Sequence, residues 1–294
     1  MNAKAKGYVL GAIAAATYGM NPLFALPLYK AGMNPDSVLF LRYLFAIPVL
    51  GIMIKARGRN FKLKPNEIVP LILMGLLVSF SSLALFQSYN YMEAGIASTL
   101  LFVYPILVAL IMAFVFKEKL TLQTIFCILL ALGGIGLLYK SGDGTTLSLT
   151  GVLLVMASAL SYAIYIVANG RIGKCVRWQS KSTFIMIGSA LTIFIVNSQT
   201  IIIDNHFGGS FMLWALFLAI IGTTIPTALF AAGIPKIGVG ISSILMTIEL
   251  PVAVICAVVV LNEHISPVQI AGIVVMLTAI SIINYYKSLK NKSN

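Results

Sequence analysis

Residues 104–123 read YPILVALIMAFVFKEKLTLQ, and residues 249–272 read ELPVAVICAVVVLNEHISPVQIAG. In both stretches a proline stands near the start of a long apolar run, and a glutamate follows the end of the run. These glutamates, Glu118 and Glu263, are 145 positions apart. A polar residue and a proline that recur at one offset within apolar sequence indicate that the chain contains an internal repeat.

Other parts of the chain repeat at nearly the same offset. The sequence GIAS at 95–98 recurs as GISS at 240–243, and TYG at 17–19 is matched by SYA at 161–163. The matches include polar and glycine positions in consistent order, so chance similarity between apolar segments is a poor explanation. The two halves of the chain are therefore predicted to share one fold.

The composition indicates a membrane protein. Of the 294 residues 60% are hydrophobic and 10% are charged, and the mean hydropathy is +1.00. A water-soluble fold does not hide so much apolar surface, whereas runs of about 20 apolar residues can each cross a bilayer. We expect an all-α membrane protein with ten transmembrane helices, at about residues 7–28, 37–54, 68–88, 95–116, 121–139, 150–169, 182–203, 211–234, 238–261 and 266–286.

Five of the expected helices fall within residues 1–140 and five within 147–288, and we predict that these segments are the two repeats. An odd number of spans makes the second repeat enter the membrane from the opposite side. The halves are then inverted-topology repeats, related by an axis in the membrane plane.

Basic residues outside the expected helices alternate from loop to loop. Seventeen of the 20 Lys and Arg residues fall at the termini and in the even-numbered loops, against Lys30 and Lys140 in the others. Positively charged loops stay in the cytoplasm, so both termini are predicted to be cytoplasmic, with the plasma membrane of a bacterium as the expected location.

Several function classes find no support in the sequence. The net charge of +12 comes from short interhelical segments with no contiguous basic surface, so we do not expect nucleic-acid binding. Cys127 and Cys256 lie in apolar runs and Cys175 in a basic loop, while His206 and His264 fall in loops without metal-ligand spacing. We expect no metal, no cofactor and, because no GxxxxGK[ST] motif occurs, no ATP hydrolysis.

The two quoted stretches resemble the EamA-type branch of the drug/metabolite transporter superfamily. The shared pattern is a proline in the fourth helix of each unit, a glutamate about a dozen residues later, then Thr or Ser, Gln and a helix rich in small residues. Members usually have Glu directly before Pro in the ninth helix, whereas Leu250 separates Glu249 from Pro251 here. The resemblance implies that helices 1–4 and 6–9 surround a central cavity, with helices 5 and 10 outside.

Two ionisable residues fall inside the expected spans. Glu249 lies thirteen residues from Lys236 and fourteen from Glu263, which places it near the bilayer midplane. Arg42 is shallower, six residues after Asp36. Because such groups are costly in hydrocarbon, we interpret Glu249 as a coupling residue, a substrate contact or a buried hydrogen-bond anchor. Arg42 either pairs with Glu249, satisfies loop carbonyls or faces the cavity.

Polar aromatic residues recur at equivalent positions of the two repeats. Tyr18 matches Tyr162, and Tyr104 matches Glu249 at an offset of 145. Equivalent positions of inverted repeats converge on the axis between them, so these residues are expected to line one cavity. The predicted substrate-binding residues are Tyr18, Asn21, Tyr104, Tyr162, Tyr165 and Thr223, with Glu249 and Arg42 as a coupling site or ion pair.

The expected function is secondary transport by alternating access, with a small-molecule substrate and protons as a candidate coupling ion. The resemblance favours export of metabolites such as amino acids. Two alternatives remain, an intramembrane enzyme and a sensor or assembly subunit that transports nothing. An enzyme would need a nucleophile with its base, or a metal cluster, and the spans contain neither pattern, so we do not expect catalysis. The sequence leaves open whether two copies form a homodimer.

Overall fold

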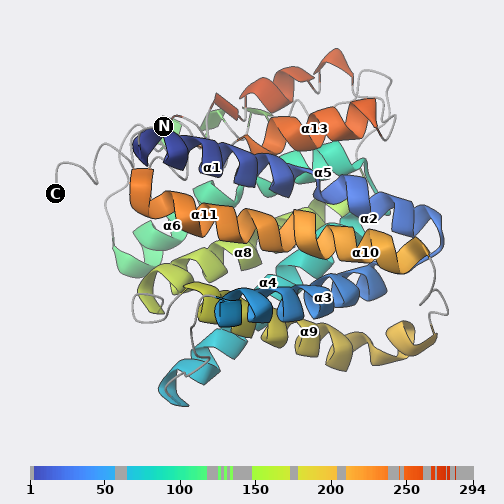
Figure 1. Cartoon of the computed structure of the whole chain (residues 1–294). Coiled ribbons are helices and arrows are strands. Elements are labelled where there is room, and N and C mark those ends of the chain that lie inside the picture. The colour runs from blue at the N-terminus through green and yellow to red at the C-terminus, as the bar shows by residue number, and fades with distance from the viewer. Residues whose placement is uncertain are drawn as a thin grey trace.

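The fold is all-helical throughout the part of the chain that the computed structural model describes, and no strand occurs there (Figure 1). The described residues are 3–56, 65–117, 125–126, 129–130, 133–134, 148–172, 178–203, 210–237, 245, 248–260, 266–268, 270–275, 277–278 and 282.

The helices of the first half follow the apolar runs of the sequence. They are α1 (Ala3–Gly19), α2 (Asn21–Lys30), α3 (Pro35–Ala56), α4 (Pro65–Ser88), α5 (Ala94–Leu101) and α6 (Tyr104–Phe116). Those of the second half are α8 (Leu149–Ile172), α9 (Trp178–Ile203), α10 (Ser210–Ala219), the π-helical turn η1 (Ile220–Thr224), α11 (Ile225–Ile237) and α13 (Glu249–Val259).

Seven of these helices or helix pairs are long and apolar enough to cross a membrane, and α13 is a shorter apolar helix. Their places agree with eight of the ten expected spans. Of the segments expected to form the fifth and tenth helices, 121–139 lies largely outside the described residues and 266–286 is described only in pieces, while Glu118 and Glu263 lie outside. The structure therefore shows a multi-pass membrane protein, while the count of ten stays a prediction.

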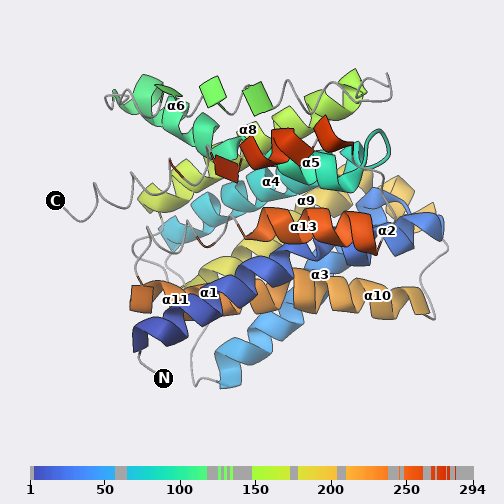
Figure 2. The ribbon, with the colours of Figure 1, turned by 90° about the horizontal axis from the view of Figure 1, so that it is seen from above.

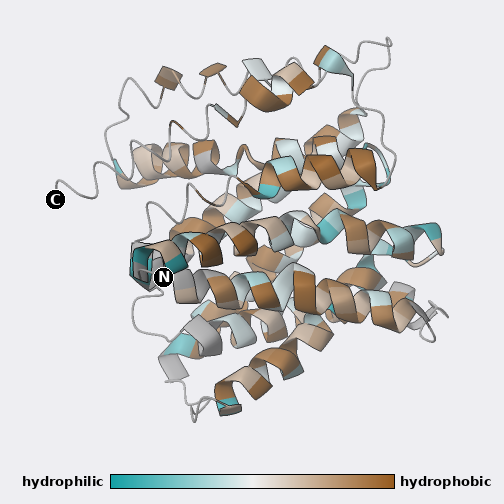
Figure 3. Ribbon diagram, turned by 45° about the horizontal axis from the view of Figure 1, so that its top comes forward, coloured by the Kyte–Doolittle hydropathy of each residue, from teal (hydrophilic) through white to brown (hydrophobic). Residues whose placement is uncertain are grey.

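Hydrophobic residues occur along the outer helices as well as the inner ones (Figure 3). Phe114 is 78% exposed and Ile195 is 74% exposed, although both lie within candidate spans. In water such surfaces would associate, whereas in a bilayer they face lipid at little cost. The interior is closed by small and branched residues, among them Ala25, Ala46 and Leu39, which are fully buried.

Small residues allow α4 to lie against both α8 and α9. A methyl group added at Gly75 would stand 2.8 Å from the carbonyl oxygen of Ile185 and 2.9 Å from the Cα of Gly188. The Ser189 hydroxyl donates to the Gly75 carbonyl at 2.9 Å, and the Ser161 hydroxyl donates to the Leu77 carbonyl at 2.9 Å. Close backbone approach and hydroxyl bonds of this kind hold helices together in membranes, where lipid removes the hydrophobic driving force.

Several expected spans are interrupted within the membrane, and α1 and α2 take the place of one helix over 7–28 (Figure 2). The expected helix 7–28 is divided at Met20, 95–116 is divided at 102–103, and 211–234 contains the π-helical turn η1. Within a few residues of each interruption stands a proline, Pro22, Pro105 or Pro226. Proline has no N–H to donate to the preceding turn, so it removes a hydrogen bond of the helix there. α13 likewise begins at Glu249, two residues before Pro251.

The interruptions are unequal in the two halves. The break at Val103 and the start of α13 after Ile248 are 145 positions apart, in agreement with the internal repeat. By contrast, the position equivalent to the break at Met20 is Ile164, in the middle of the continuous α8. Residues equivalent by sequence thus have different backbone conformations.

Candidate functional site

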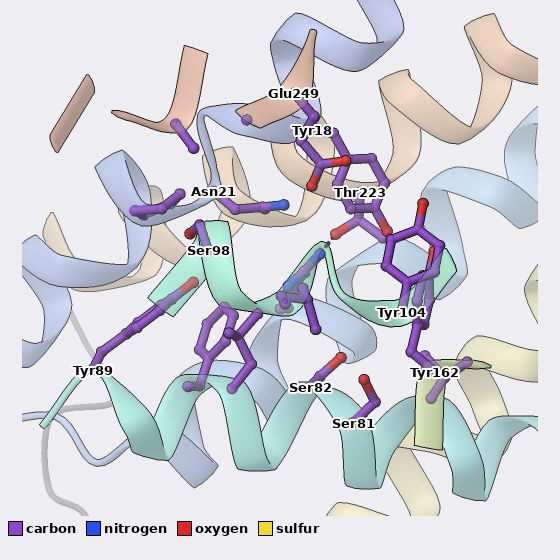
Figure 4. A pocket seen from close by; sticks show the side chains of 18 of the residues that line it. Tyr18, Asn21, Ser81, Ser82, Tyr89, Ser98, Tyr104, Tyr162, Thr223 and Glu249 are labelled. Carbon is purple, nitrogen blue, oxygen red and sulfur yellow. Dashed lines mark hydrogen bonds between the residues drawn. The ribbon is translucent and has the colours of Figure 1, made fainter. Parts of the chain in front are cut away.

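A polar cavity lies among the interrupted helices (Figure 4). It encloses about 90 Å³ of space that the centre of a water molecule can reach. Residues from every break contribute to it, including Gly19 and Asn21, Phe102 and Tyr104, and Thr223 and Glu249. Its polar lining consists of Tyr18, Asn21, Arg42, Tyr43, Ser81, Ser82, Tyr89, Ser98, Tyr104, Tyr162, Thr223 and Glu249.

Arg42 is held on one wall of the cavity by hydrogen bonds to another span. Its Nε donates to the Thr223 hydroxyl at 2.6 Å, and one of its terminal nitrogens lies 3.4 Å from the Gly222 carbonyl oxygen. The guanidinium carbon is 5.7 Å from the ring centre of Tyr43 and 5.6 Å from that of Phe86, within the range of cation–π attraction. Only 5% of the surface of Arg42 is exposed, so its side chain is held inside the bundle and does not extend to a loop.

The π-helical turn supplies both oxygen atoms that Arg42 contacts. A π-helical turn changes the register of the helix, so backbone groups are available to other partners. Here the carbonyl of Gly222 and the side chain of the next residue, Thr223, face the same guanidinium. The hydroxyl of Thr224 instead donates to the Ala219 carbonyl at 2.9 Å, within the same helix.

Glu249 is the first residue of α13 and is half-buried on the cavity wall. A carboxylate at this position is stabilised by the positive end of the helix dipole. Its backbone carbonyl touches Gly19, where a methyl group would collide with it, so α1 and α13 meet at this level. No ion pair within 4 Å joins Glu249 and Arg42 among the described residues, although both are close enough to Tyr18 to influence it electrostatically.

Tyrosines form the opposite wall. The rings of Tyr104 and Tyr162 meet edge to face, with centres 4.9 Å apart and an interplanar angle of 88°. Tyr165 packs behind Tyr162 with its ring centre 5.6 Å away and does not reach the cavity. Edge-to-face contact fixes the ring of Tyr162, so the cavity has a rigid aromatic side.

Asn21, the first residue of α2, projects into the cavity with its amide nitrogen leading (Figure 4). Only 8% of the residue is exposed, and its side-chain oxygen has no hydrogen-bond partner. This oxygen lies against Gly222, where a methyl group would overlap it. The contact joins α2 to the π-helical turn that holds Arg42.

The structure brings seven of the eight sequence-predicted site residues to this cavity and leaves Tyr165 behind it. Arg42 contacts a neighbouring span, neither loop carbonyls nor Glu249. No group of three or more His, Cys, Asp or Glu side chains in the described part of the chain could hold a metal ion.

Several lining residues escaped the sequence analysis. Ser98 ends the GIAS motif, so the internal repeat was the signal that could have identified it. No such signal identified Tyr43, Phe86 and Tyr89, because aromatic residues within a span occur at the membrane–water interface as well as in cavities.

Comparison with known proteins identifies the family. The sequence profile of the EamA-like transporter family matches residues 5–140 and again residues 149–285. The chain belongs to the EamA-like transporter family. This EamA-like chain is 24% identical to an uncharacterized transporter of Clostridium kluyveri, over 97% of this chain and 94% of that protein. It is also 24% identical to the uncharacterized transporter YvbV of Bacillus subtilis, over 88% and 86% of the two chains.

One relative has a substrate in its name. The threonine/homoserine exporter RhtA of Salmonella typhimurium is 24% identical over 72% of this chain and 69% of its own length. A crystal structure with 18% sequence identity covers 95% of this chain and 96% of its own, with a TM-score of 0.67, and supports the fold. The family and the helical membrane fold are thereby confirmed as predicted.

Proposed function

We propose that this EamA-like protein is a secondary transporter that exports small metabolites such as amino acids across the cell membrane by alternating access. The observation that carries the proposal is the cavity at the helix breaks, where an arginine and a glutamate face one enclosed space without an ion pair between them. In secondary transporters, substrate sites lie near the midplane where spanning helices are interrupted.

The size of the cavity fits a small solute. The 90 Å³ that the centre of a water molecule can reach is space for several water-sized groups side by side. An amino acid such as threonine has about eight non-hydrogen atoms and is of this size. Threonine and homoserine, named for the RhtA relative, are both zwitterions of this class.

Alternating access requires one side of the cavity to be closed. With cytoplasmic termini, the lining residues Phe86 and Tyr89 lie in the exoplasmic half of the bundle, whereas Gly75 and Gly188 lie in the cytoplasmic half. The close contact of the two glycines supports closure on the cytoplasmic side. We further propose that residues 1–140 and 147–288 are inverted repeats that exchange conformations, which accounts for the different backbones at Met20 and Ile164.

Counterflow in liposomes tests the proposal. The purified full-length chain is reconstituted into vesicles loaded with an unlabelled mixture of the twenty L-amino acids, and uptake of each labelled amino acid is measured. We expect uptake of at least one of them to exceed that of protein-free vesicles. A reconstituted, folded chain that exchanges none of them would overturn the amino-acid proposal and favour another solute or a sensor role.

A further inference from the structure

We propose that the cavity binds its substrate as a bridge between two fixed charges, with a carboxylate on the free edge of Arg42 and an ammonium group on Glu249. This inference rests on the proposed function and assigns the orientation of the substrate, with Thr223 as the residue that positions Arg42.

The hydrogen bonds of Arg42 leave one edge of its guanidinium available. Arginine has five N–H donors, and those to Thr223 and Gly222 use the Nε edge and one terminal nitrogen. A third donor is within hydrogen-bonding reach of the Tyr18 hydroxyl, which leaves two of the five for a ligand in the cavity. A planar guanidinium with two such donors matches the two oxygens of a carboxylate.

A nearby anion would stabilise the buried positive charge of Arg42. The residue is 5% exposed, and no carboxylate lies within 4 Å of it among the residues described. The rings of Tyr43 and Phe86 and the oxygens of the π-helical turn stabilise the cation only partly, since none of them carries a full negative charge. A bound carboxylate would supply the missing charge.

Glu249 presents the complementary group on the same cavity. Glu249 and Arg42 line the same cavity, and both act electrostatically on Tyr18. A zwitterion places opposite charges on neighbouring carbon atoms and can satisfy both residues at once. A solute with one charge would leave the other residue buried without a partner, which is costly, so the arrangement also selects against such solutes.

Thr223 has a distinct part in this arrangement. Its hydroxyl accepts from Nε at 2.6 Å, and this bond turns the opposite edge of the guanidinium toward the cavity. Replacing Thr223 by valine keeps the shape of the side chain and removes the acceptor. The positive charge would remain, but its orientation would be lost.

Titration calorimetry on the purified full-length chain tests the assignment. The twenty L-amino acids are screened first, and the tightest binder is compared with its amino alcohol, which lacks the carboxylate, and with its 2-hydroxy acid, which lacks the ammonium group. We expect the wild type to bind the amino acid at least about tenfold more tightly than either analogue, as for hydrogen bonds to charged groups.

Substitutions separate the two ends of the substrate. In Arg42→Gln the preference over the amino alcohol should fall below about threefold while the preference over the hydroxy acid remains, and Glu249→Gln should show the reverse. Thr223→Val should reduce only the preference over the amino alcohol. The control is Thr192→Val, because Thr192 donates to the Gly188 carbonyl at 2.8 Å outside the cavity and should leave both preferences unchanged.

The outcomes distinguish this inference from the proposed function. Binding of amino acids with preferences that survive in both Arg42→Gln and Thr223→Val would overturn the orientation and leave the proposed function intact. If Arg42→Gln does not fold, the preference of Thr223→Val for the amino acid over the amino alcohol decides whether the orientation holds. A wild type that binds none of the twenty amino acids would overturn the substrate class and the orientation together.

Discussion

Asn21 and Gly222 touch across the gap between α2 and η1, and no side chain other than hydrogen fits at position 222. The added methyl group of Gly222→Ala would overlap the Asn21 side-chain oxygen, so Asn21 or the π-helical turn must move. Overpacking of this kind costs about 1–3 kcal/mol. We predict a lower midpoint of thermal unfolding in detergent and weaker substrate binding, because the same turn holds Arg42.

A second substitution separates this contact from other effects of alanine at position 222. Asn21→Ala removes the obstructing oxygen, so the double variant Asn21→Ala/Gly222→Ala should unfold at a higher temperature than Gly222→Ala alone. Contacting residues typically show such non-additivity. Equal midpoints for the single and double variants would show that the Asn21 contact is not what limits position 222.

At the scale of residues, the sequence pointed to the charged groups and to the tyrosines that recur in the two repeats, and it missed Tyr43, Phe86 and Tyr89. Glu249 and Arg42 stand out because ionisable residues are rare in apolar spans. The bond from Arg42 to Thr223 joins positions 181 apart, and no local pattern encodes it. Phe86 and Tyr43 flank the guanidinium through tertiary packing alone, which a single sequence does not reveal.

At the scale of elements, the crossing of α4 and α9 depends on two glycines. Gly75→Ala would place a methyl group 2.8 Å and 2.9 Å from backbone atoms of Ile185 and Gly188. Backbone atoms cannot relieve such a contact by a change of rotamer, as a side chain can. The helices would separate, at a cost of about 1–3 kcal/mol. We predict a lower thermal midpoint for the purified protein and a raised rate of amino-acid exchange or leak in liposomes if this crossing closes the cavity.

Gly133→Ala is the matched control, because a methyl group at Gly133 would meet nothing within 4 Å. Alanine is the better helix former, so the midpoint should stay unchanged or rise slightly. If Gly133→Ala lowered the midpoint as much as Gly75→Ala, close packing at the α4–α9 crossing would not explain the effect.

The apolar runs predicted where helices occur and failed to predict where they break. The expected span 37–54 is observed as Pro35–Ala56, and 68–88 as Pro65–Ser88. These helices begin and end where the sequence changes from polar to apolar residues, because the apolar residues lie in lipid and the polar ones in water. Prolines do not by themselves locate a break. Pro48 and Pro70 lie inside continuous helices, whereas the helix is interrupted before Pro22. Whether a proline interrupts a helix depends on which groups can bond the backbone carbonyl that the proline leaves without a partner. Those groups belong to neighbouring helices.

At the scale of the whole molecule, the distribution of basic residues predicts the orientation in the membrane. Cysteines introduced at Asn60 and at His206 fall in oppositely oriented expected loops, both outside the described residues. On intact cells, an impermeant thiol reagent should label position 206 and not position 60. The native cysteines are replaced beforehand, and labelling after permeabilisation shows that both positions can react. Labelling of position 60 on intact cells would reverse the topology and the proposed closure on the cytoplasmic side.

We predict that transport is coupled to protons at Glu249, a carboxylate that lines the cavity. Its carboxyl group faces the cavity from the start of α13 and can exchange a proton with whichever side the cavity opens to. If transport is coupled to protons there, Glu249→Gln should abolish accumulation driven by a pH gradient in liposomes. Exchange of substrate across equal pH should continue when measured at saturating substrate, because the glutamine amide still fits the position although its contact with the ammonium group is weaker.

The comparison of driven and undriven flux separates coupling from a merely structural role. A residue that only anchored helices would, when replaced, lower the thermal midpoint and reduce both fluxes alike. Glu67→Gln, at the start of α4 and outside the cavity, is the matched control and should leave both fluxes unaltered. Accumulation that continues with glutamine at position 249 would exclude proton coupling through this carboxyl group. The gradient would then have to act elsewhere, and Glu249 would keep only its contact with the ammonium group of the substrate.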